Sequence, residues 1–139
     1  MLYTSTRNHE VKISAAEAIT RGISEDGGLF VPVSIPAIDR AFLESLQNKD
    51  YIERAVSVLR LFLEDFSEDE LRRYAQGAYG GGKFSGSVPA PVVSADEHLN
   101  ILELWHGPTC AFKDMALQIL PYLLTGSAKK INNHNKIII

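Results

Sequence analysis

The feature that most constrains the fold is a pair of amphipathic segments joined by a helix-start signal. In residues 51–66 apolar side chains recur at steps of three and four, which predicts a helix with one buried face. Ser67 and Glu70 then form a capping box, in which each side chain accepts from the other's backbone N–H, and a second helix is expected to about Ala78. Two such helices must bury their apolar faces, so a mainly helical core is predicted.

Shorter elements are expected before this pair. Ser14 and Glu17 form another capping box, and the Asp-Gly-Gly sequence of residues 26–28 is typical of a turn. Helices are therefore predicted at residues 15–22 and 39–48, and a short strand at residues 29–31.

The glycines and serines of residues 80–87, followed by Pro89 and Pro91, interrupt the helical pattern. We expect a domain boundary there. Residues 1–90 are predicted to form an α+β N-terminal domain, mainly helical with short strands, and residues 91–139 the start of a second domain.

The second segment has the pattern of an α/β layer structure. Residues 101–105 predict a strand, and residues 112–124 an apolar helix that Pro121 should kink. Residues 137–139 begin another apolar strand, yet a buried parallel strand needs neighbours at both edges. The chain is thus predicted to be of the α/β class and to be a piece of a larger protein, ending in the first strand–helix unit of a parallel sheet.

Composition excludes several classes of function. The net charge of −3 offers no basic excess for a nucleic acid or an anionic membrane, and we expect neither as a partner. No apolar run is long enough to cross a membrane or to form a signal peptide. The single cysteine, Cys110, cannot form an internal disulfide, which favours a reducing, cytoplasmic location. The four histidines lack metal-ligand spacing, so no metal site is predicted.

Residues 77–83 match the start of a phosphate-binding P-loop, G-x-x-x-x-G-K. The next residue is Phe84 instead of the Ser or Thr that would reach a metal, and the motif follows a predicted helix instead of a strand. A loop between domains is the better interpretation.

One lysine stands out on chemical grounds. Lys113 is predicted to lie in the first turn of an otherwise apolar helix, where the helix dipole and partly dry surroundings would both disfavour its ammonium form. A neutral amine is what a Schiff base with an aldehyde requires. An ordinary surface lysine at a helix start fits the same pattern.

The stretch around this lysine, His-Gly-Pro-Thr-Cys-Ala-Phe-Lys-Asp over residues 106–114, resembles the cofactor-lysine motif of the threonine synthases. These are fold-type II enzymes that use pyridoxal 5'-phosphate (PLP). A second block is similar as well: Tyr-Thr-Ser-Thr-Arg at residues 3–7, and Asp-Gly-Gly-Leu-Phe-Val-Pro at residues 26–32. Asn8 stands where the family usually has glycine, and Cys110 where leucine is common.

The resemblance implies a function and a set of roles. The family converts O-phospho-L-homoserine and water to L-threonine and phosphate. Lys113 would bind PLP as a Schiff base and then act as general base, Phe112 would pack beside the cofactor, and Asp114 would position Lys113. Ser5, Thr6 and Arg7 match a motif placed near the substrate. The segment 91–139 would begin the PLP-binding domain.

Several expectations stay open at this level. The family's glycine-rich phosphate cradle should follow residue 137, so the 139-residue chain alone is expected to be inactive. The rival functions are a related fold-type II PLP lyase and a noncatalytic module that binds a partner through the helices of residues 51–78. An unpaired edge at residues 137–139 would either promote a homo-oligomer or stay disordered.

Overall fold

The computed structural model describes residues 1–86 and 88–133 and contains short strands among helices. The helices are α1 (Ala15–Arg21), α2 (Arg40–Leu46), α3 (Tyr51–Phe62), α4 (Glu68–Tyr79), α5 (Asp114–Leu117) and α6 (Leu120–Lys130). The strands are β1 (Tyr3–Ser5), β2 (Phe30–Pro32), β3 (Val92–Ser94) and β4 (Asn100–Leu102). This is the mixed α/β content expected from the sequence.

Side-chain caps explain where the helices begin. Ser14 and Ser67 each accept from the backbone N–H three residues on, and both predicted capping boxes are present. Asp50 forms a third capping box with Glu53 at the start of α3. These caps replace the partners that the first N–H groups of a helix lack, so local sequence alone sets these starts.

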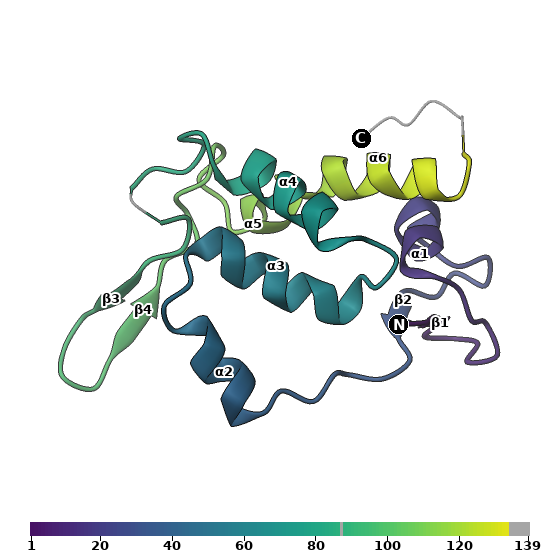
Figure 1. Cartoon of the computed structure of the whole chain (residues 1–139), viewed down its shortest axis with the longest axis horizontal. Coiled ribbons are helices and arrows are strands. Elements are labelled where there is room, and N and C mark those ends of the chain that lie inside the picture. The colour runs from purple at the N-terminus through teal and green to yellow at the C-terminus, as the bar shows by residue number, and fades with distance from the viewer. Residues whose placement is uncertain (87, 134–139) are drawn as a thin grey trace.

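The core joins α1, α3, α4 and α6, and we call these four helices the helical framework. Figure 1 shows α3 and α4 side by side, with α6 running past the end of α1. The buried apolar residues of this core are Ala15, Val56, Leu63, Phe66, Leu71, Ala75, Ala78, Ile119 and Leu123. Because Ile119 and Leu123 belong to it, the described part of the second segment shares the core of the first. The boundary near residue 90 stays a prediction.

The helix over residues 51–66 ends earlier than expected, at Phe62. Leu63 leaves the helical conformation with φ −113° and ψ 59°, and Phe66 follows in the link to α4. Both side chains are nevertheless buried. The apolar pattern therefore continued past the helix because the link lies against the same core.

The predicted helix over residues 112–124 is wrong as a single element, because α5 and α6 replace it. Pro121 lacks the N–H that would bond to Leu117, and it stands in the first turn of α6, where that N–H is not needed. Proline thus starts a new helix here instead of kinking an existing one.

The strand expected at residues 101–105 is shorter and paired differently. β4 forms an antiparallel hairpin with β3, with Val93 opposite Ile101. The hairpin extends away from the helices (Figure 1), and all six of its residues are exposed. No parallel pair forms within residues 1–86 and 88–133. The strand predicted at Ile137, Ile138 and Ile139 lies outside these residues. No helix in the described part of the chain is both long and apolar enough to cross a bilayer.

Candidate functional site

Residues 106–113 form a loop between β4 and α5, which we call the lysine loop. The Asp114 carboxylate anchors it, with one oxygen 2.8 Å from the Thr109 backbone nitrogen and the other 2.9 Å from the Thr109 hydroxyl. Asp114 is 1% exposed, and a Cβ at Gly107 would lie 2.4 Å from the Asp114 Cβ. Glycine at 107 therefore permits this close approach, and a buried charge is compensated by two donors.

Lys113 is the residue immediately before α5, and its side chain is exposed. The dry surroundings expected from the sequence are not found in the described chain, because α5 has only four residues and Asp114 turns its carboxylate toward Thr109. Among the described residues, the Lys113 amine has neither a hydrogen bond nor an ion pair. Asp114 thus holds the loop that carries Lys113 and, in the described structure, forms neither a hydrogen bond nor an ion pair with the amine itself.

A cavity of about 640 Å³ opens beside this lysine. Its walls come from one face of α3, from the end of the hairpin and from the lysine loop with α5. The lining residues are Tyr51, Arg54, Ala55, Val58, Ala90, Leu102, Leu104, Phe112, Lys113, Met115 and Ala116. The cavity thus combines a free amine with mainly apolar and aromatic walls.

This arrangement fits the aldehyde and ring of PLP but offers little to its phosphate. Lys113 provides the amine, and Phe112, 66% exposed, provides an aromatic surface on the same cavity. Arg54 is the other cation of the lining, yet its guanidinium donates to the carbonyls of Leu46 and Gln47 at 2.9 and 2.8 Å. The described residues can therefore hold the reactive end and the ring of the cofactor.

Sequence reasoning did not find Tyr51, Arg54 and Val58 as cavity residues. They lie at helical spacing on α3, next to the stripe that faces the core. A charged residue interrupts this second face, so the periodicity that marks the core face does not include it. This face of α3 becomes a cavity wall only because the hairpin and α5, which come more than 30 residues later, lie opposite it.

Ser5, Thr6 and Arg7 form a separate cluster. The Ser5 hydroxyl, fully buried, lies 2.8 Å from the Asp26 carboxylate, and the Leu29 N–H donates to the Thr6 hydroxyl at 3.0 Å. The Arg7 guanidinium donates to the Asp26 carbonyl at 3.2 Å. The triplet thus ties β1 to the turn before β2.

The hydrogen bonds of this turn lower the pKa of the Asp26 carboxyl group. The Gly28 N–H donates to it at 2.8 Å, and that bond, aided by the hydroxyls of Ser5 and Ser24 against a desolvation cost, lowers the pKa of Asp26. A charged Asp26 is therefore part of the folded turn.

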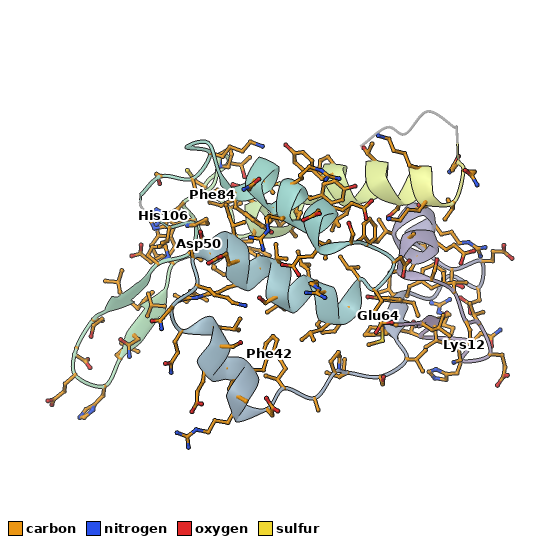
Figure 2. All side chains as sticks on the ribbon, viewed as in Figure 1. Lys12, Phe42, Asp50, Glu64, Phe84 and His106 are labelled. Atoms are coloured by element: carbon orange, nitrogen blue, oxygen red, sulfur yellow. The ribbon has the colours of Figure 1, made fainter. Side chains whose placement is uncertain are left out.

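The structure does not bring this cluster to Lys113. Tyr3, in the same strand as Ser5, donates its hydroxyl to the carbonyl of Phe62 in the last turn of α3. The lysine cavity, in contrast, is lined by Arg54 of the same helix. Eight residues of helix separate these points, or about 12 Å along the axis. Figure 2 likewise shows His106, of the lysine loop, at the Asp50 end of α3 and Glu64 at the other end. The substrate contact of Ser5, Thr6 and Arg7 stays a prediction.

The other sequence motifs have simpler outcomes. The P-loop-like residues 77–83 begin in the last turn of α4 and continue past its end at Tyr79, and the Lys83 amine donates to the Gly77 carbonyl at 2.5 Å. Within the described residues, no group of three or more His, Cys, Asp or Glu side chains could hold a metal ion.

At the start of the lysine loop, His106 contacts two side chains. Its Nε2 lies 2.6 Å from the Glu103 carboxylate, and its Nδ1 lies 3.0 Å from the Ser85 hydroxyl. The Ser85 N–H also donates to the His106 carbonyl at 2.8 Å. These bonds fix the loop to the segment that follows α4.

Comparison with known proteins identifies the family that this chain resembles. The family model described as threonine synthase N terminus matches residues 2–79. The threonine synthase of Schizosaccharomyces pombe is 39% identical over 120 residues, which cover 85% of this chain and 23% of that protein. That of Saccharomyces cerevisiae is 36% identical over 137 residues, 94% of this chain and 27% of that protein.

Solved structures agree with these relatives. The PLP-bound threonine synthase of Brucella melitensis superposes with a TM-score of 0.86 at 32% identity, covering 95% of this chain and 28% of that one. The yeast threonine synthase gives a TM-score of 0.85 at 34% identity, covering 97% and 28%. The chain thus spans roughly a quarter of the length of the proteins it matches.

Proposed function

The chain belongs to the threonine synthase family, and we propose that it supplies the PLP-binding lysine of an enzyme that converts O-phospho-L-homoserine and water to L-threonine and phosphate. The observation that carries this proposal is the Lys113 amine, exposed and without a partner among the described residues, at a cavity with aromatic walls. An amine free of ion pairs has no salt bridge to break before it reacts with an aldehyde.

The residues of the cavity have different roles in this proposal. When bound, PLP withdraws electrons from the carbon skeleton of the amino acid, so that protons next to the amino group become removable. Phe112 and Tyr51 offer flat apolar surface for its ring. Asp114 and Gly107 hold the loop in place, so Lys113 starts from a fixed backbone.

Lys113 serves twice in this proposal. Its Nζ would hold the aldehyde of the cofactor and would be free once the substrate amine takes its place. The released Nζ then accepts and returns protons at Cα and Cβ of the substrate, which is general acid–base catalysis. Phosphate leaves from Cγ, which takes up the proton lost from Cβ, and water adds at Cβ, so the atoms of the reaction balance.

The phosphate of PLP needs a further anchor. Backbone N–H groups at a glycine-rich helix start usually provide one. In the described part of the chain, two helices begin at this cavity, α3 at Tyr51 and α5 at Asp114, and neither start is glycine-rich. We therefore expect the 139-residue chain alone to bind PLP weakly and to lack turnover.

The proposed enzyme acts on a small molecule in the cytoplasm. The lone Cys110 is exposed, and a reducing compartment keeps such a thiol free. Neither nucleic acid nor a membrane is part of the proposal.

The test is a product assay on the complete polypeptide with O-phospho-L-homoserine and PLP. We expect equal release of threonine and phosphate, and loss of both in Lys113→Ala, whereas the exposed Lys129→Ala retains them. Release of 2-oxobutyrate in place of threonine would favour a related PLP lyase. A function that survives Lys113→Ala would favour a noncatalytic module.

A further inference from the structure

The contacts of His106 form a chain of three side chains that the proposed function does not use. Glu103 and His106 are each 21% exposed at the side chain and lie 2.6 Å apart, so their contact is largely sheltered from water. Ser85, which is exposed, completes the chain at 3.0 Å from His106 Nδ1. The order is carboxylate, imidazole, hydroxyl.

Hydrogen-bonding rules fix the roles within this chain. An ionised carboxylate can only accept, so Nε2 of His106 carries a proton directed at Glu103. When the ring is neutral, Nδ1 is then a bare acceptor for the Ser85 hydroxyl at 3.0 Å, closer than the other acceptor of that hydroxyl, the His106 carbonyl at 3.4 Å. This is the arrangement in which an imidazole can remove a serine proton while a carboxylate stabilises the imidazolium that forms.

The backbone around Ser85 supports attack on a carbonyl group. The Ser85 N–H bonds to the His106 carbonyl at 2.8 Å and fixes the two segments against each other. The next residue, Gly86, has φ 97°, and its N–H has no acceptor among the described residues. The N–H after a nucleophilic serine is a usual donor to the oxygen that becomes negative during acyl transfer.

We propose that Ser85, His106 and Glu103 form an acylation site that takes an acyl group from an activated ester. The Ser85 Oγ forms a bond to the ester carbonyl carbon, and its proton passes to His106 Nδ1. The bond between that carbon and the leaving alcohol then breaks, and the alcohol takes the proton from His106. The products are acyl-Ser85 and a free alcohol.

This site is independent of the threonine synthase reaction, because no step of it uses Lys113 or PLP. Ser85 lies outside the lining of the lysine cavity. Failure of either proposal therefore leaves the other standing.

The experiment treats the complete polypeptide, without PLP, with p-nitrophenyl acetate and follows acetylation by peptide mapping. Cleavage by hydroxylamine distinguishes an acetyl ester on Ser85 from an acetyl amide on the nearby Lys83. The control is Ser94, an exposed serine whose hydroxyl donates to the Asp96 carbonyl and, among the described residues, forms no hydrogen bond with an imidazole.

We expect Ser85 to be acetylated about 100-fold faster than Ser94, the size of effect that a positioned general base gives. Glu103→Gln should slow labelling of Ser85 about tenfold, and His106→Gln should reduce it to the rate at Ser94. Equal rates at the two serines in the unmodified protein would overturn the proposal, whether or not the variants fold. So would a Ser85 rate that His106→Gln leaves unchanged in a protein with native circular dichroism.

Discussion

The helical framework and the lysine loop are held together by different forces. The framework buries apolar side chains from four helices in one cluster. The lysine loop and α5 contribute Gly107 and Asp114 as their buried residues before Ile119, and the loop is held by hydrogen bonds to Asp114, Glu103 and Ser85. Apolar burial acts without direction, whereas hydrogen bonds fix geometry. The part of the chain proposed to do chemistry is thus positioned by polar contacts on a framework made stable elsewhere.

The largest effect should come from the framework. Leu71 is fully buried in α4, so Leu71→Ala should lower the free energy of unfolding by about 3 kcal/mol through lost burial and a cavity. Chemical denaturation measures this value. The matched control is Leu43→Ala, because Leu43 is 56% exposed, and its effect should stay within about 0.5 kcal/mol. Similar losses in both variants would mean that the core is not where the structure places it.

The next effect should be confined to the lysine loop. Asp114→Asn replaces one of two acceptor oxygens by a donor that faces Thr109, at a cost of about 2 kcal/mol. Because the loop has little apolar burial, we expect this cost to appear as local opening, with the Thr109 amide exchanging its hydrogen about 30-fold faster. Asp69→Asn, at an exposed carboxylate, serves as control. Unfolding of the whole chain by Asp114→Asn would contradict the separation of the two regions.

A smaller effect is expected where the two regions meet. The Tyr79 hydroxyl of α4 donates to the Met115 carbonyl of α5 at 2.7 Å, and Tyr79→Phe should cost about 1 kcal/mol. Burial, with the nearby Tyr51, raises the pKa of Tyr79 to about 12. A phenol with a raised pKa contributes its stabilisation fully below about pH 10 and loses it as the pH rises toward 12.

Alkaline denaturation therefore checks this link. Between pH 9 and pH 12 the unmodified chain should lose more stability than Tyr79→Phe does. The difference between their free energies of unfolding should therefore become smaller as the pH rises. A gap that stays constant would show that the Tyr79 hydroxyl does not join the framework to α5.

The smallest effect is expected at the turn that holds β1. The Gly28 N–H, with Ser5, lowers the pKa of Asp26, so its contribution is present above about pH 4 and is lost as the pH falls through the lowered value. Asp26→Asn should flatten the acid side of the stability profile by a small amount, since the group is exposed. If the free energy of unfolding changes with acidic pH in the same way in both proteins, the Asp26 turn does not contribute to the pH dependence of stability.

The framework was predictable from sequence because its signals are local. The capping boxes at Ser14 and Ser67 act over three residues, and the inward positions Val56, Leu71, Ala75 and Ala78 follow from helical spacing. Such patterns depend on neighbours in the same helix, so no knowledge of the fold is needed.

The site was less predictable because its contacts are not local. The hairpin depends on pairing Val92 with Leu102, and short runs after Pro89 and Pro91 gave no signal for β3. The acylation site joins Ser85 to a histidine 21 residues away. The resemblance to the threonine synthases located Lys113, yet the apolar pattern after it suggested one long helix where Pro121 begins a new one.

The most direct test of the central claim is to trap PLP on the complete polypeptide with borohydride and map the modified peptide. We predict one PLP per chain, attached to Lys113 and absent from Lys113→Ala, with Lys83 and Lys129 unmodified. Full PLP binding with the reduced adduct on another lysine, or with Lys113 unmodified, would contradict the account.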